Sequence, residues 1–183
     1  AALPLCILVA LAGAAGLLVF KVGGVPSRFP PSLAAYERYA SYDHAAAYGT
    51  RTCFLRAEQD ERAFGRCVDA PSRDGAPSVL LWGDSHAAHL YPGIKKTLGG
   101  SALLVHLAAS GCGPILGLEP PDRPNCRRVN DHVFRLVSET KPDRVILAGN
   151  WLRYDWRRLE GTIKGLKRAG VPRIDLVGPV PRW

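Results

Sequence analysis

Apolar runs of the β type alternate with amphipathic segments from Val79 onward, and this alternation limits the possible folds more than any other feature. The runs are residues 79–82, 102–107, 144–148 and 174–177. Between them, apolar residues recur at the spacing of a helix face, as in Leu90, Ile94 and Leu98, in Val129, Val133 and Leu136, and in Leu159, Ile163 and Leu166. Alternating strands and helices are joined by right-handed crossovers. The sequence therefore predicts an α/β domain with a parallel sheet that helices cover on both faces.

An uncharged apolar segment opens the sequence. Residues 1–20 are almost all Ala, Leu, Val, Ile and Gly, and their number suits a bilayer core, so we expect a membrane-spanning helix over 1–21. A signal peptide is the alternative, but the chain has no Met and no basic stretch before the apolar run. We therefore expect the last span of an upstream membrane domain. Residues 22–76 are expected to form a linker with an irregular or helical extension, and 77–183 the α/β domain.

The cysteines bear on the cellular compartment. Cys6 lies in the apolar segment, and the others are Cys53, Cys67, Cys112 and Cys126. Four cysteines can pair in three ways, and none lies in a C-x-x-C or beside a His at metal-ligand spacing, which argues against a zinc site. Two local loops, 53–67 and 112–126, closed by disulfides would suit an oxidising compartment such as the bacterial periplasm. Four buried free thiols in a cytosolic protein are the alternative, and Lys21 and Arg28 after the apolar segment favour the cytoplasm weakly.

The net charge of +8 suggests an anionic partner, because 24 basic residues stand against 16 acidic ones. Much of the excess lies between Arg123 and Arg173. No series of aromatic residues for base stacking accompanies these charges, which argues against nucleic acid. We expect a solvated basic face near anionic lipid or glycan.

Residues suited to acyl transfer follow the predicted strands. Asp84 and Ser85 end the first run, and Ser110, Gly111 and Asn150 follow the next two. Reactive groups of doubly wound sheets lie beyond the carboxyl ends of the strands. A serine that attacks an ester creates an oxyanion, which the Ser85 N–H, the Gly111 N–H and the Asn150 amide could stabilise. Ordinary turns and a helix-capping Asn are the alternatives.

The first of these segments resembles a known family. Gly83-Asp84-Ser85 after a strand, a glycine after the second strand and Asn150 after the third resemble three motif blocks of the SGNH (GDSL-type) hydrolases. More narrowly, the segment 81–88, the cysteine pairs and the segment 177–181 resemble the periplasmic SGNH domain fused to membrane O-acyltransferases of the O-antigen and exopolysaccharide type. The resemblance implies the flavodoxin-like three-layer SGNH fold, here preceded by one transmembrane helix.

The same resemblance implies roles for individual residues. Ser85 would be the nucleophile that takes an acyl group from the membrane partner domain, and Asp84 would support the loop. The general base would be the His of a late Asp-x-x-His block, which the sequence does not contain. We expect that block beyond Trp183, and we expect these residues alone to be inactive. His86 adjoins the nucleophile, but adjacent side chains usually diverge, and His89, His106 and His132 are interpreted as helix or strand residues with local partners.

The leading hypothesis is an O-acyltransferase domain that modifies a cell-envelope glycan. Its expected partners are an upstream membrane acyltransferase domain, a glycan acceptor and the membrane, and not nucleic acid. An SGNH esterase that removes acetyl groups is the first alternative, and a catalytically silent glycan-binding module is the second. No spacing implies a metal or another cofactor. The third motif block departs from the family pattern, Gly-x-Asn-Asp, because Gly149 directly precedes Asn150 and Trp151 follows it.

Overall fold

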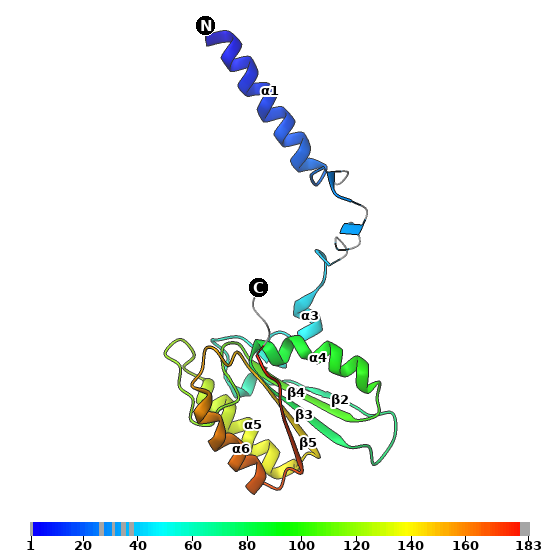
Figure 1. Ribbon diagram of the computed structural model, residues 1–183, viewed down its shortest axis with the longest axis vertical. Helices are drawn as coiled ribbons and strands as arrows, with labels where there is room; N and C mark the ends of the chain where they lie inside the picture. The colour runs from blue at the N-terminus through cyan, green and yellow to red at the C-terminus, as the bar shows by residue number, and fades with distance from the viewer. Residues whose placement is uncertain (1, 26–27, 31, 34–35, 37–38, 180–183) are drawn as a thin grey trace. The chain divides into compact units, whose positions relative to one another are not determined.

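The computed structural model describes residues 2–25, 28–30, 32–33, 36 and 39–179. It divides into two compact units, residues 1–43 and 44–183 (Figure 1). The first unit contains helix α1 (Ala2–Lys21), whose side chains from Leu3 onward are exposed. Its segment Leu3–Lys21 is long and apolar enough to cross a membrane.

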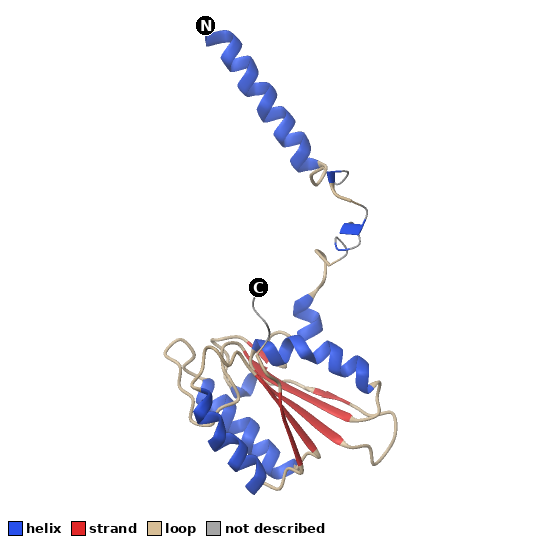
Figure 2. Cartoon of the chain, viewed as in Figure 1, coloured by secondary structure: helices blue, strands red, loops and turns tan. Residues whose placement is uncertain are grey.

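The second unit is built around a six-stranded sheet (Figure 2). Its strands are β1 (Phe54–Leu55), β2 (Val68–Asp69), β3 (Ser78–Gly83), β4 (Leu103–Ala109), β5 (Arg144–Ala148) and β6 (Arg173–Leu176). They lie in the order β1-β4-β3-β5-β6, all parallel, while β2 pairs with β4 in the antiparallel direction. The predicted parallel sheet is confirmed, and each predicted strand lies within two residues of the observed one.

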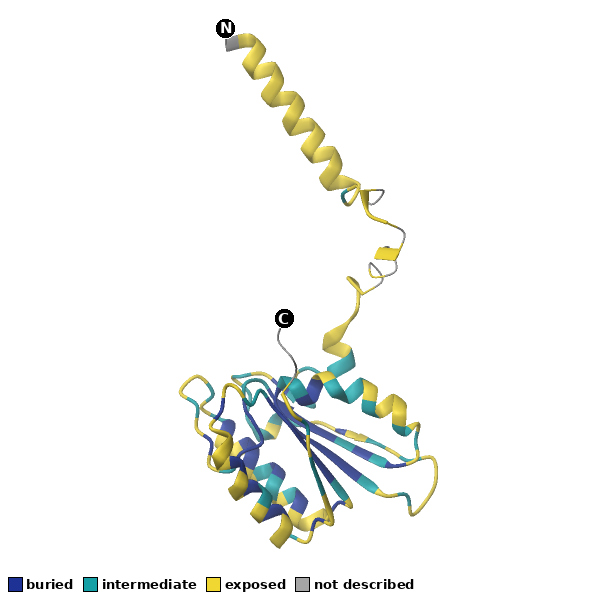
Figure 3. Ribbon diagram, in the orientation of Figure 1, coloured by how far each residue is buried: buried dark blue, intermediate teal, exposed yellow. Residues whose placement is uncertain are grey.

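Helices cover both faces of this sheet, as the alternating pattern predicted. They are α3 (His44–Tyr48), α4 (Ser85–Leu98), α5 (Cys126–Thr140) and α6 (Leu159–Arg168), with short 3₁₀ turns η2 (Glu61–Ala63) and η3 (Trp156–Arg158). Helix α4 lies on one face, and α5 and α6 lie on the other (Figure 1). Burial is concentrated between these layers (Figure 3).

The central strand β3 has apolar side chains on both faces because both are covered. Leu80 and Trp82 join the cluster under α5 and α6, whereas Val79 and Leu81 join the cluster under α4. The indole N–H of Trp82 donates to Oδ1 of Asn130 at 3.1 Å, so even the polar edge of this buried ring has a partner. The strand therefore holds a fixed position between the layers.

The segment before β3 is more ordered than the sequence suggested. We predicted a short helix and irregular structure there, but β1 and β2 add to the edge of β4. Each strand has only two residues, which is too short for an alternating pattern to reveal. Backbone pairing with β4, and not hydrophobic periodicity, defines them.

Both disulfides that we favoured are present. Cys53 is bonded to Cys67 and Cys112 to Cys126, each across 14 positions of sequence. The first joins the segments of β1 and β2, and the second closes the loop between β4 and α5. Cys6 is a free, exposed thiol on α1.

The predicted basic face carries carboxylates as well as arginines and lysines. Several of its arginines and lysines are engaged in ion pairs with carboxylates. Arg127 pairs with Glu119 and Asp131, Arg128 with Asp60 and Glu61, Arg144 with Asp175, and Lys164 with Glu160. The formal excess of charge therefore overstates the charge available to a partner.

Candidate active site at the carboxyl edge of the sheet

The turn from β3 into α4 depends on a close approach to β5. A Cβ atom at Gly83 would overlap the carbonyl oxygen of Ala148, so only glycine allows the two strands to pair at this level. Asp84 follows as the N-cap of α4, and its carboxylate accepts a hydrogen bond from the His86 N–H. Ser85 is consequently the first residue of α4, directly beyond the end of a buried strand.

The Asp84 carboxylate is buried, with 1% of the residue exposed, and it connects two loops. Its Oδ1 accepts from the His86 N–H at 2.8 Å. Its Oδ2 accepts from the Asn150 N–H at 2.9 Å and from the Tyr154 hydroxyl at 2.8 Å. A carboxylate removed from water needs such donors. Asp84 therefore joins the Ser85 turn to the loop that follows β5.

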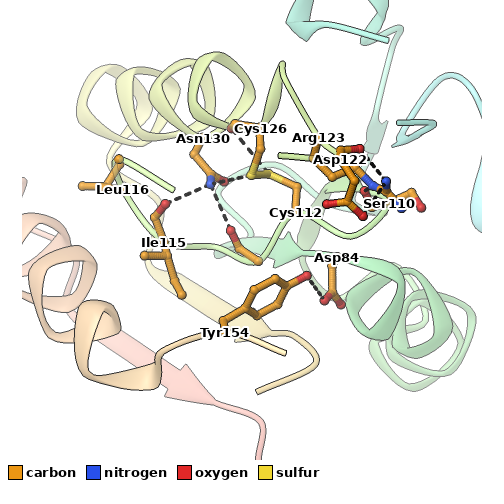
Figure 4. Close-up of a disulfide and its surroundings, with 12 residues drawn as sticks. Asp84, Ser110, Cys112, Ile115, Leu116, Asp122, Arg123, Cys126, Asn130 and Tyr154 are labelled. Carbon is orange, nitrogen blue, oxygen red and sulfur yellow. Dashed lines mark hydrogen bonds and ion pairs between the residues drawn. A yellow bond between two sulfur atoms is a disulfide. The ribbon is translucent and has the colours of Figure 1, made fainter. Parts of the chain in front are cut away.

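Tyr154 is the third group at this carboxylate, and no pattern in the sequence indicated its role. Burial of its side chain and the neighbouring Asp84 charge raise the pKa of Tyr154, so its hydroxyl stays a proton donor. The ring occupies space that a side chain at Gly113 would need, since a Cβ there would lie 2.6 Å from Cε2 of Tyr154. Figure 4 shows the ring between the 112–116 segment and Asp84. Tyr154 thereby links the loops after β4 and β5.

The loop after β4 is fixed by several independent contacts. The disulfide Cys112–Cys126 joins its beginning to the start of α5. Buried Asn130 donates from Nδ2 to the carbonyl oxygens of Gly113 at 2.9 Å and Ile115 at 3.0 Å (Figure 4). Gly111 lies just before this fixed segment and has a φ of +63°, a conformation that favours glycine.

The sheet order brings the three predicted blocks together at one edge. Because β4 and β5 flank β3, Gly111 and Asn150 follow the strands on either side of the strand that precedes Ser85. Within the described part of the chain, the Ser85 hydroxyl, the Gly111 N–H and the Asn150 side-chain amide have no hydrogen-bond partner. This edge therefore presents a hydroxyl and two unoccupied donors.

Histidines lie on and near α4, but among the described residues none is fixed against a carboxylate as a triad base would be. The His86 and His89 rings stack at 6.4 Å, and His89 contacts Tyr48 at 5.0 Å between ring centroids. Burial, together with neighbouring His86, lowers the pKa of His89, which keeps its ring neutral at pH 7. Among the residues that the structure describes, no group of three His, Cys, Asp or Glu side chains is arranged to hold a metal ion.

His106 lies in β4 and packs against a local partner. It is 1% exposed in β4, stacked on Tyr91 with ring centroids 4.4 Å apart, and both ring nitrogens lack a partner among the described residues. Burial lowers the pKa of His106 to about 4, so the ring is neutral at pH 7. His132 stacks on Phe64 at 5.9 Å, which agrees with a local packing role.

Comparison with known proteins gave two matches. A family model described as the SGNH domain (fused to AT3 domains) matches residues 51–183. The solved periplasmic domain of a lipopolysaccharide acetyltransferase from Salmonella ser. Paratyphi A is similar in fold, with a TM-score of 0.59 and 20% sequence identity. That match covers 81% of this chain and 59% of the solved chain, so this chain spans less than two thirds of the solved chain. No curated protein matched.

Proposed function

Because this chain belongs to the family of SGNH domains that are fused to AT3 domains, we propose that it transfers an acyl group to a hydroxyl of a cell-envelope glycan. Acetyl is the acyl group that we favour, since the similar solved structure is from a lipopolysaccharide acetyltransferase. The observation that carries the proposal is Ser85 at the start of α4, between the loops that carry the Gly111 N–H and the Asn150 side-chain amide.

Ser85 would act as a nucleophile that carries the acyl group between donor and acceptor. Its Oγ forms a bond to the acyl carbonyl carbon while its proton passes to a general base. The oxygen that gains negative charge would be stabilised by the N–H groups of Ser85 and Gly111 and by the Asn150 amide. The donor's leaving group then departs with a proton. A sugar hydroxyl attacks the acyl-serine and restores the Ser85 hydroxyl.

We further propose a membrane-attached protein with this domain on the periplasmic side of the bacterial inner membrane. Helix α1 would be the span next to the AT3 domain, which would supply the acyl group. The disulfides Cys53–Cys67 and Cys112–Cys126 support an oxidising compartment.

Replacement of the nucleophile in the complete native protein tests this function. Ser85→Ala should reduce acyl transfer to the glycan by about a thousandfold or more, as expected for loss of a catalytic serine. Ser101→Ala is the matched control, because Ser101 is exposed and precedes β4 at the opposite end of the sheet. Retention of transfer within about threefold in Ser85→Ala would contradict the proposal and favour a glycan-binding module.

The same preparation separates transfer from hydrolysis. An acyltransferase should require both the acyl donor and the glycan, and the acetylated glycan should accumulate with time. An SGNH esterase would instead release acetate from an acetylated glycan without any donor. Donor-independent release as the main activity would favour the esterase.

A further inference from the structure

We propose that Arg123 is a positioning residue that fixes the direction of the Gly111 N–H, an inference that depends on the proposed function of this site. Arg123 belongs to the loop between β4 and α5, and it lies outside the three motif blocks that contain Ser85, Gly111 and Asn150. Its side chain is only 22% exposed, although it is an arginine in a loop. Its contacts account for this burial.

The guanidinium of Arg123 binds the backbone on the carboxyl side of β4. Nε donates to the carbonyl oxygen of Ser110 at 2.7 Å. Nη1 donates to the carbonyl oxygen of Asp122 at 2.6 Å and to its Oδ2 at 3.1 Å. Arg153, from the loop after β5, also binds Oδ2 of Asp122. Figure 4 shows Arg123 beside Asp122 and Ser110. Because Arg123 and Arg153 both bind the Asp122 carboxylate, this turn is connected to the loop after β5.

The bond to Ser110 determines where the next N–H points. The Ser110 carbonyl and the Gly111 N–H belong to one planar peptide unit, and no cis peptide bond occurs among the described residues. In a trans peptide the C=O and the N–H point in opposite directions. By holding the carbonyl oxygen on its own side, Arg123 directs the Gly111 N–H to the other side, where none of the described residues accepts a hydrogen bond from it.

The identity of Gly111 fits the same arrangement. A Cβ atom at this position would lie 2.7 Å from Nε of Arg123, so the guanidinium occupies the space of the missing side chain. The positive φ of +63° is also unfavourable for other residues. Gly111 and Arg123 therefore depend on each other. The absence of a side chain at Gly111 leaves space for the guanidinium, and the guanidinium fixes the peptide unit between Ser110 and Gly111.

Substitution of Arg123 separates the effect of its geometry from that of its charge. Arg123→Ala removes both, while Arg123→Lys keeps the charge and loses the planar fork that serves Ser110 and Asp122 together. We expect kcat for acyl transfer by the complete native protein to fall about a hundredfold in Arg123→Ala, as for loss of one oxyanion donor. We expect a fall of at least about tenfold in Arg123→Lys, with KM for the glycan changed less than about threefold in both.

The affinity for a boronic acid reports on the oxyanion donors separately from the stability of the fold. A boronic acid forms a tetrahedral anion on a serine hydroxyl and so requires the oxyanion donors. Arg123→Lys should weaken boronate binding by the same factor as kcat, with an unchanged melting temperature. Arg127→Ala is the control, because Arg127 is a neighbouring arginine that is 58% exposed and pairs with surface carboxylates. It should leave kcat and boronate binding unchanged.

The outcomes distinguish this inference from the proposed function. If Ser85→Ala abolishes transfer while Arg123→Lys retains full kcat and full boronate binding, the role of Arg123 is refuted and the nucleophile stands. If Ser85→Ala retains transfer, the proposed function itself fails. If Arg123→Ala does not fold, Arg123→Lys decides the question, because it preserves the aliphatic stem and the charge. A drop in kcat that an equal loss of folded protein explains would also overturn the inference.

Discussion

Removal of the Tyr154 hydroxyl should measure how strongly the buried Asp84 carboxylate holds the site together. Tyr154→Phe keeps the ring that packs against Gly113 and deletes only the O–H that donates to Asp84 at 2.8 Å. A hydrogen bond to a charged group contributes about 1.5–3 kcal/mol, and its loss leaves a buried oxygen with one donor fewer. Because Asp84 keeps the N–H groups of His86 and Asn150, we expect the free energy of unfolding to fall by about 2 kcal/mol.

Tyr91→Phe is the matched control for this substitution. The Tyr91 hydroxyl also donates to an aspartate, Asp69, at 2.6 Å. That carboxylate is partly exposed and keeps its ion pair with Lys95, so we expect a loss of less than about 1 kcal/mol. Urea unfolding followed by tryptophan fluorescence measures both variants. Equal losses, or no loss for Tyr154→Phe, would refute the view that Asp84 depends on Tyr154.

The pH dependence of the Tyr154→Phe effect provides a second check. Burial and the Asp84 charge raise the pKa of Tyr154 in the folded chain above the unfolded value of about 10. The hydroxyl therefore contributes its full stability below pH 10 and loses it as the pH rises above that value. The difference between wild type and Tyr154→Phe should shrink above pH 10. A difference that stays constant would contradict the raised pKa.

Three further predictions follow from the fold. Gly83→Ala should lower the free energy of unfolding by more than about 4 kcal/mol in urea titration, because the new Cβ would overlap the Ala148 carbonyl oxygen of β5; a cost below about 1 kcal/mol would contradict this close approach. Burial lowers the pKa of His106 to about 4, so its contribution to the free energy of unfolding is complete above the unfolded pKa of about 6.5 and falls by about 3 kcal/mol as the pH drops to 4. His106→Leu should remove this part of the acid dependence in urea titrations at pH 7 and 4.5. An equal loss of stability on acidification in the variant would argue against it. Replacing both Cys112 and Cys126 by serine should cost about 3 kcal/mol, as expected for a loop of this length, and a thermal shift no larger than that of Cys6→Ser would contradict it.

The parallel sheet could be predicted because its strands and helices have strong, regular patterns. The runs that became β3, β4, β5 and β6 are long enough to be recognised in the sequence. Because these strands are parallel, their carboxyl ends lie at one edge of the sheet, where Ser85, Gly111 and Asn150 follow them. Hydrophobic periodicity was therefore sufficient to predict the parallel sheet and the edge at which the candidate site lies.

The supporting residues could not be predicted in the same way. Tyr154 and Asp84 are separated by 70 positions, and Arg128 and Glu61 by 67, so no local pattern connects them. Arg123 was counted among the basic residues as part of a solvated surface, although it binds backbone carbonyls. Such roles depend on how loops meet after folding, and a periodic pattern contains no information about that meeting.

An acyl group on Ser85 can be detected by mass spectrometry of the complete native protein. The protein is incubated with acyl donor, and the reaction is stopped by acid before glycan is added. We predict that one peptide gains the mass of a single acetyl group, located at Ser85, and that glycan added before the acid removes it. If Ser85 carries no acetyl group while the same preparation acetylates glycan, the acyl group reaches the acceptor without this serine, and transfer through an acyl-serine is refuted.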